Sequence, residues 1–289
     1  MRSETEMKEL ILGIARNDDR IRAVILNGSR ANPSATPDIF QDYDIVYVVT
    51  EVAPFKNDPE WLDQFGELMI MQRPDEMGDS TRGDGDPYAF LMQFADGNRI
   101  DLTLYPIERV NELYGDSLSI LLLDKDGILE PFPPASEEGY LPKPPTENEF
   151  NDCCNEFWWV CPYVAKGLWR EEIIYAKSMQ DQYVRAMLMK MLAWYIGIKT
   201  DFSLSPGKLG KHFERYLEPE LWETLKGTYA DADYDHTWES LEKMCQLFRI
   251  TSRAVAEHFG FQYPIDEDEK VSAHLKHVRS LPKNAEEMY

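Results

Sequence analysis

Short apolar runs dominate the first half of the chain, and their composition is typical of β-strands. They are rich in β-branched and aromatic residues and are separated by clusters of Gly, Pro, Asn and Asp. Residues 4–16 precede them with apolar positions at helical spacing, so we expect a helix that covers the sheet. The predicted strands are residues 21–26, 43–49, 68–71, 88–94 and 99–105, followed by a segment, 107–123, that is helical and then extended.

The second half of the chain has apolar residues at helical spacing instead. Between the halves, residues 131–145 contain six prolines in fifteen positions, a density that excludes a helix or an inner strand. We therefore predict an α+β chain: a mixed β-sheet domain with flanking helices at 1–135, then an all-α helical bundle domain at 146–289. The helices predicted in the bundle are 150–164, 169–197, 207–216, 219–228, 235–258 and 266–278.

Two carboxylates stand at the start of the second predicted strand. Side chains alternate along an extended chain, so Asp42 and Asp44 project to one side and Tyr43 to the other. Two carboxylates on one face repel each other unless a cation lies between them, and Mg²⁺ suits hard oxygen ligands of this kind. The alternative is a polar loop followed by an Asp-x-Asp that caps or solvates the end of a strand.

A Gly-Ser turn after the first predicted strand provides the elements of a phosphate site. Gly28 lets the backbone approach a ligand closely, and free N–H groups with the Ser29 hydroxyl could hold phosphate oxygens. Arg30 could add a charge-assisted contact to the same phosphate.

A third carboxylate lies in the second arm of a predicted hairpin. Asp96-Gly97-Asn98 is the turn, and Ile100, Leu102 and Leu104 share one face of the following strand. Asp101 lies on the other face, where an unpaired carboxylate is costly to bury. It therefore indicates a metal ligand or a proton-transfer group, and the alternative is an edge-strand Asp that faces water.

The formal net charge of −22 is the strongest signal in the composition. It argues against a nucleic-acid partner or an anionic membrane surface, which require clusters of Lys and Arg. It favours a cationic partner steered by the field of the whole protein, although solubility alone would also explain an acidic chain.

The chain shows no targeting or membrane-spanning segment, and its cysteines do not form a disulfide or zinc pattern. Cys153 and Cys154 are adjacent, and Cys161 and Cys245 complete the set, which suits reduced thiols. A cytoplasmic protein without a membrane contact is the expectation. The tripeptide Arg82-Gly83-Asp84 matches an adhesion motif, which we interpret as a coincidence.

With these motifs in place, the chain resembles a known family. Gly28-Ser29, twelve residues, Asp42-x-Asp44 and a later strand Asp101 form the pattern of DNA polymerase beta-like nucleotidyltransferases. The segments LNGSRANP, FQDYDIVYVVT, DGNRIDLTL and YVAKGLWREEI are similar to the aminoglycoside 6-adenylyltransferases, which modify streptomycin, and the likeness covers nearly the whole chain.

This resemblance implies roles for the residues of the nucleotidyltransferase domain. Gly28 and Ser29 match phosphate-loop positions, Asp42 and Asp44 match metal-binding carboxylates, and Asp101 matches the third acidic position. Asp101 would be a catalytic base or a third metal ligand, a choice that the sequence leaves open.

For the helical domain, the resemblance implies a substrate-binding role. Lys208, which follows Pro206 and Gly207, corresponds to a phosphate-contacting lysine, and Asp181 to a drug-contacting carboxylate. Glu156 or Glu172 could pair a guanidinium group of the drug. Trp158 and Trp159 could offer ring faces to a cation, with hydrophobic core as their alternative.

The implied function is transfer of AMP from ATP to a hydroxyl of a cationic aminoglycoside, streptomycin at position 6. One or two Mg²⁺ ions would assist, pyrophosphate would be released, and antibiotic resistance would follow. Alternatives are a nucleotidyltransferase for another aminoglycoside or a protein hydroxyl, and an inactive nucleotide-binding module. The sequence does not decide the oligomeric state.

Overall fold

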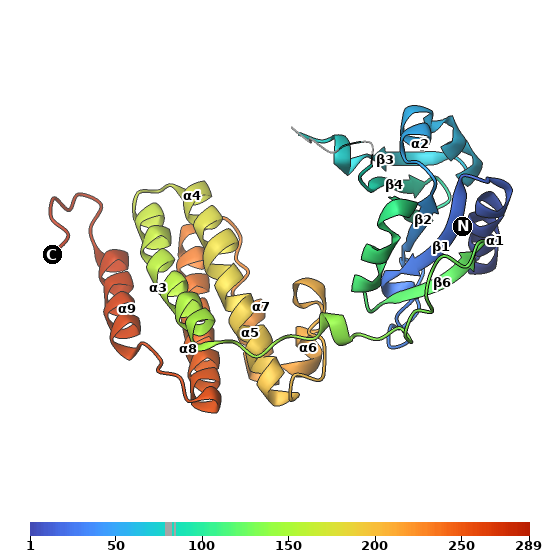
Figure 1. The fold of residues 1–289 in the computed structure, drawn as a ribbon. Helices are drawn as coiled ribbons and strands as arrows, with labels where there is room; N and C mark the ends of the chain where they lie inside the picture. The colour runs from blue at the N-terminus through green and yellow to red at the C-terminus, as the bar shows by residue number, and fades with distance from the viewer. Residues whose placement is uncertain (79–82, 84) are drawn as a thin grey trace. The chain divides into compact units, whose positions relative to one another are not determined.

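The computed structural model describes residues 1–78, 83 and 85–289, and in it the chain divides into two compact units, Met1–Gly139 and Tyr140–Tyr289. The point of division lies within the proline-rich run. The first unit holds a mixed sheet with helices, and the described residues of the second form helices and loops (Figure 1). The predicted α+β class is therefore confirmed. Arg82 and Asp84 of the adhesion-like tripeptide lie outside the described residues.

The sheet of the first unit has six strands in the order β3-β4-β5-β2-β1-β6. Its two central strands, β2 and β5, run parallel, and the other neighbouring pairs are antiparallel. All five strands predicted from the apolar runs are confirmed, and the extended end of 107–123 forms the sixth. The bounds are β1 Ile21–Asn27, β2 Tyr43–Val49, β3 Leu68–Gln72, β4 Tyr88–Phe94, β5 Arg99–Pro106 and β6 Ser119–Asp124.

Helix α1, Glu4–Asn17, covers one face of this sheet, as its apolar spacing predicted. A capping box between Ser3 and Glu6 begins the helix, since each satisfies a backbone N–H of the other. Tyr47 of β2 donates its hydroxyl to the carbonyl of Ile11 at 2.6 Å, which fixes the helix on the strand. The other helical segments are α2 Ala53–Asn57 and the 3₁₀ turns η1 Gly28–Arg30, η2 Pro59–Phe65, η3 Pro74–Glu76 and η4 Ile107–Gly115.

The two faces of the sheet differ, and that difference positions the carboxylates. On the α1 face, Tyr43, Ile100 and Leu102 are fully buried in one apolar core. On the other face, a smaller core around Ile25 and Val48 fills one end of the sheet. The remaining end of that face carries the polar side chains of β2 and β5.

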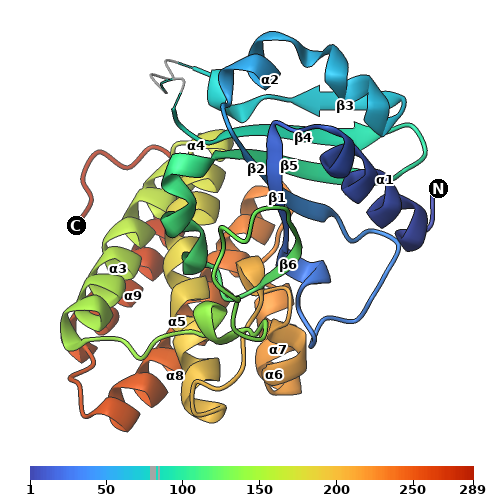
Figure 2. The same ribbon diagram turned by 45° about the vertical axis from the view of Figure 1, so that its right-hand side comes forward.

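The second unit is a bundle in which α3 packs on α5 and α9, and α5 packs on α8 (Figure 2). Two helix predictions were wrong in part. The helix expected at 169–197 begins only at Ile173, because Trp169 ends α3 and Glu171 adopts a left-handed φ of 61°. Of 207–216, only Phe213–Tyr216 is α-helical, since a short 3₁₀ turn forms at Lys208–Gly210. The helices are α3 Glu147–Trp169, α4 Ile173–Ser178, a π-helical turn Met179–Val184, α5 Arg185–Lys199, α6 Phe213–Tyr216, α7 Pro219–Lys226, α8 Tyr234–Phe259 and α9 Ile265–Ser280.

Within the described part of the chain, no helix combines the length and the apolar composition that crossing a membrane requires.

Candidate active site

The parallel pairing of β2 with β5 brings two of the predicted carboxylates together. Asp44 and Asp101 are direct partners in the register of these strands, so their side chains lie next to each other on one face. Their neighbours Tyr43 and Ile100, also partners, point into the core on the opposite face. Asp42 precedes β2 by one residue and completes the group, which we call the acid cluster: Asp42, Asp44 and Asp101.

Gly28 lies against the acid cluster and has room for no side chain. Its φ is +71°, a conformation that L side chains rarely adopt. A Cβ at this position would lie 2.1 Å from Oδ2 of Asp44 and 2.9 Å from its Cγ. The glycine predicted for close approach of a ligand is thus also required for close approach of Asp44.

Arg99 links two members of the acid cluster. It lies two residues before Asp101 on β5, so both side chains share one face of the strand. Its Nε and Nη2 donate to Oδ1 and Oδ2 of Asp101, each at 2.8 Å. The same Nε lies 3.6 Å from Oδ2 of Asp42. The acid cluster and Arg99 together therefore comprise three negative side chains and one positive side chain.

Asp44 carries the most unfavourable charge of the three acids. Burial, first, and then the charges of Asp101 and Asp42 raise its pKa to about 6, even though the charge of Arg99 lowers it. Burial also raises the pKa of Asp42, against the favourable charge of Arg99. Among the described residues, the Asp44 carboxylate accepts no hydrogen bond and forms no ion pair. An added cation would remove this repulsion.

The donor chemistry of the acid cluster fits a divalent ion that prefers oxygen ligands. Its two strand carboxylates are adjacent, and Asp44 has free oxygens facing a negative neighbourhood. In the described part of the chain, however, no three His, Cys, Asp or Glu side chains already converge on one point. In this structure Arg99 holds Asp101 and approaches Asp42.

Arg30 is engaged by the protein itself in this structure. Its guanidinium lies 3.8 Å from the ring centroid of Tyr43, on the face opposite the acid cluster. It donates from Nε to the carbonyl of Asp42 at 3.1 Å and from Nη2 to the carbonyl of Gln41 at 2.8 Å. With 11% of its side chain exposed, Arg30 fastens the backbone that carries Asp42. The phosphate contact predicted for Arg30 stays a prediction, and in this structure the side chain binds backbone carbonyls instead.

The Gly-Ser turn offers fewer phosphate donors than the sequence suggested. The N–H of Gly28 is not free, because it donates to the carbonyl of Leu118 at 3.1 Å. The carbonyl of Ser29 accepts a bond from Gln41 at 3.3 Å, whereas its hydroxyl has no partner among the described residues. Ser29 is thus the donor that the turn leaves open to a ligand.

The predicted site residues of the second unit lie on different parts of its surface and core. Lys208 is exposed in a 3₁₀ turn, and Glu156 is half-buried on α3. Asp181 lies in the π-helical turn, 2.9 Å from Nη2 of Arg185 and 3.3 Å from Nζ of Lys177. Two cations therefore already neutralise this carboxylate.

Two adjacent tryptophans of α3 have opposite environments. Trp158 is 1% exposed and packs edge-on against Phe157 and Phe248 in the core. The cation that approaches its ring, at 5.6 Å, is Arg249 of the protein itself. Trp159 is 62% exposed, so its indole, and not that of Trp158, is open to a ligand.

Comparisons with known proteins decide the family. A model of the streptomycin adenylyltransferase family matches residues 1–278. The chain belongs to the streptomycin adenylyltransferase family. The resemblance expected from the motifs is confirmed, and with it an enzyme of the nucleotidyltransferase type.

Relatives in this family match the chain almost end to end. Aminoglycoside 6-adenylyltransferase from Bacillus subtilis is 42% identical over 96% of this chain and 98% of its own length. The enzyme of the same name from Campylobacter jejuni is 44% identical over 95% of each chain. A crystal structure of an aminoglycoside 6-adenyltransferase from Bacillus subtilis matches with 39% identity, covering 97% of this chain and 100% of its own, at a TM-score of 0.48.

Arg99 is the residue of this family member's acid cluster that sequence reasoning missed. The signal was present, because Arg99 and Asp101 are two residues apart on a predicted strand and so share a face. The approach to Asp42 had no such signal, since it depends on the pairing of β5 with β2.

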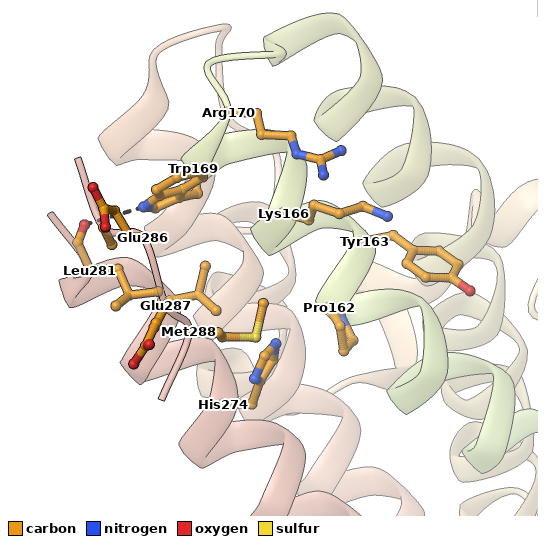
Figure 3. Close-up of a pocket in the computed structure, with 12 residues that line it drawn as sticks. Pro162, Tyr163, Lys166, Trp169, Arg170, His274, Leu281, Glu286, Glu287 and Met288 are labelled. Carbon is orange, nitrogen blue, oxygen red and sulfur yellow. Dashed lines mark hydrogen bonds between the residues drawn. The ribbon is translucent and has the colours of Figure 1, made fainter. Parts of the chain in front are cut away.

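A cavity of about 390 Å³ lies within the helical unit, between α3 and the C-terminal tail (Figure 3). Trp169 donates its indole N–H to the carbonyl of Leu281 at 3.3 Å, and Lys283 donates to the carbonyl of Trp169 at 2.7 Å. These bonds fasten the tail that forms one wall of the cavity. None of the residues predicted to bind a ligand lines it.

Proposed function

We propose that this protein transfers AMP from ATP to a hydroxyl of an aminoglycoside, in a Mg²⁺-dependent reaction that releases pyrophosphate. The proposed acceptor is the 6-hydroxyl of streptomycin, and the result is antibiotic resistance. Family membership and the printed activity of the relatives support the proposal. The structural observation that carries it is the in-register pairing of Asp44 with Asp101 beside Gly28.

Asp42 and Asp44 would hold the metal, with Asp101 as a third ligand or as the base. When bound, one or two Mg²⁺ ions would neutralise phosphate charge and stabilise the attacking and leaving oxygens of an in-line displacement. The Ser29 hydroxyl would donate to a phosphate oxygen of ATP, next to the Gly28 backbone. Lys208, which forms no ion pair among the described residues, would add a positive contact to the triphosphate.

In the role of base, Asp101 would receive the proton of the acceptor hydroxyl. That oxygen attacks the α-phosphorus as the bond from the α-phosphorus to the bridging oxygen breaks. AMP stays on the acceptor, and pyrophosphate leaves with the electron pair. One phosphorus–oxygen bond forms as another breaks. The protein would contribute mainly by positioning the reactants and by stabilising the charge that develops.

The acceptor is a polycation, and the protein carries a net charge of −22. Long-range attraction would raise the rate of encounter, and carboxylates in the helical unit would pair guanidinium groups. On α3, the half-buried Glu156 and the exposed Trp159 would contact the drug, whereas Asp181 could bind it only in competition with Arg185. The burial of Trp158 removes it from this set. Use of ATP, together with four free cysteines, supports a cytoplasmic location.

Pyrophosphate release tests this proposal directly. The protein is incubated with Mg-ATP and a panel of aminoglycosides, with no acceptor as the blank. Release with streptomycin, accompanied by a product heavier by one AMP, is the expected result. Asp44→Asn should reduce the rate by at least about 10²-fold. Release with none of the drugs, or an undiminished rate in Asp44→Asn, would contradict the proposal.

A further inference from the structure

We propose that Arg99 is a positioning residue that takes the place of a divalent cation in the metal-free protein. Its guanidinium holds Asp101 and approaches Asp42, and ion binding displaces it from the acid cluster. This inference rests on the metal site of the proposed function. It goes further by assigning a role to a residue that neither the motifs nor the family comparisons single out.

The contacts of Arg99 are those that a cation would make. It binds both oxygens of Asp101 at 2.8 Å and lies 3.6 Å from an oxygen of Asp42. These carboxylates come from different strands, β5 and the start of β2, so one side chain keeps two segments in place. The side chain is 40% exposed, which gives it room to swing toward solvent.

Arg99 leaves the third acid unsatisfied. Asp44 is the register partner of Asp101, yet among the described residues its carboxylate accepts no hydrogen bond. One guanidinium with three carboxylates leaves two negative charges uncompensated at the cluster. A divalent ion matches that charge, but it would approach Asp101 against the positive charge of Arg99. The ion and the guanidinium therefore compete for the same carboxylates.

Competition predicts that removing the guanidinium strengthens ion binding. The probe is Mn²⁺ alone, titrated into the full chain without nucleotide and followed by the loss of its free electron paramagnetic resonance signal. Arg99→Gln should lower the Mn²⁺ Kd about tenfold, which corresponds to about 1.4 kcal/mol. Arg99→Lys keeps the charge and should restore the wild-type Kd, a rescue that a purely structural role of the guanidinium would not give.

Arg20 provides a matched control in the same unit. It is 42% exposed and donates from Nε and Nη2 to Asp18, a carboxylate two residues away, as Arg99 does to Asp101. It precedes the end of the sheet where Ile21 pairs with Val49, opposite to the end where Asn27 pairs with Asp44. Arg20→Gln should therefore leave the Mn²⁺ Kd unchanged.

The outcomes separate this inference from the proposed function. An unchanged or weaker Mn²⁺ affinity in Arg99→Gln overturns the role of Arg99. If Asp44→Asn still weakens binding in that case, the metal site of the proposed function stands. If Asp44→Asn binds Mn²⁺ like the wild type, both fail.

A measurement on the wild-type protein covers the case in which Arg99→Gln does not fold. In protein labelled with ¹⁵N-arginine, the Nε–H resonance of Arg99 is assigned by its loss in Arg99→Lys. Addition of Mg²⁺ should shift this resonance toward that of a solvent-exposed guanidinium, while the resonance of Arg20 stays in place. A resonance of Arg99 that does not move at saturating Mg²⁺ overturns the inference.

Discussion

Replacing Asp44 by Asn should stabilise the metal-free protein and abolish its catalysis. Most single substitutions reduce the free energy of unfolding or leave it almost unaltered. For Asp44→Asn we expect a gain in stability instead. The native carboxylate is half-buried, accepts no hydrogen bond from the described residues, and lies next to two other acids. The amide keeps the shape of the side chain and removes its charge.

The pKa of Asp44 gives the size and the pH range of this effect. Burial and the neighbouring acids raise it to about 6, whereas an Asp in an unfolded chain has a pKa of about 3.9. Below about pH 4 both states are protonated, so charge costs nothing. Between about pH 4 and 6 the unfolded state loses its proton first, and stability falls as the pH rises.

The difference of about two units between the folded and unfolded pKa sets an upper limit of about 3 kcal/mol on the stability lost at neutral pH. Since the carboxylate is partly open to solvent, screening reduces our expectation to about 1–2 kcal/mol. Asp44→Asn should therefore exceed the wild type in free energy of unfolding by about 1–2 kcal/mol at pH 7, and match it below about pH 4.

Urea denaturation in EDTA at the two pH values measures this difference. The two units of the chain can unfold separately, so the signal must come from the first unit alone. Trp61 is the one tryptophan of residues 1–139, and its ¹⁹F resonance in fluorotryptophan-labelled protein isolates that unit.

Asp96→Asn is a control for which we expect the opposite effect on the free energy of unfolding. The guanidinium of Arg2, 2.7 Å from Asp96, holds the pKa of that carboxyl far below its usual range. Its contribution is present at neutral pH and lost as the pH falls, so Asp96→Asn should destabilise the protein at pH 7. An Asp44→Asn protein that is no more stable than the wild type at pH 7 would refute the charge reasoning.

Three further predictions concern the surroundings of the acid cluster and the drug. Gly28→Ala should cost about 1–3 kcal/mol in the same urea assay and abolish pyrophosphate release, because its Cβ would collide with Asp44; a fully active variant would contradict this geometry. Arg30→Gln should lower kcat without raising KM for ATP, since Arg30 holds the backbone of Asp42; a rise in KM alone would indicate a phosphate contact. KM for streptomycin should rise with NaCl concentration, because salt screens attraction between the acidic protein and a cationic drug; a salt-independent KM would count against steering.

Strand positions in this protein could be predicted from sequence because each strand carries its own local signal. The alternation of Ile100, Leu102 and Leu104 with Asp101 fixed both a strand and its two faces. The pairing of Asp101 with Asp44 carried no local signal, since more than fifty residues separate them and parallel pairing is a property of the whole sheet. Motif spacing identified the acids, and only the structure supplied their register.

Side-chain direction was the part that local patterns predicted worst. Arg30 follows the Gly-Ser turn and was expected to point at phosphate, but the 3₁₀ turn directs it to the Tyr43 face. Trp158 and Trp159 were equivalent in sequence, and one helical step of about 100° separates a core position from an exposed one. Which of two adjacent positions faces the core depends on where the neighbouring helices lie.

The acid cluster has the features of a site kept for binding at the expense of stability. A structural role would favour Asn at position 44, or a hydrogen-bond donor beside the carboxylate, and neither is present among the described residues. Gly28 excludes any side chain that could fill the space next to Asp44, so the repulsion persists in the free protein. Arg99 relieves it at Asp101 and partly at Asp42, but it leaves Asp44 negative. The field that destabilises the free protein is thus the one that would attract a divalent ion, and a single guanidinium is too weakly charged to cancel it.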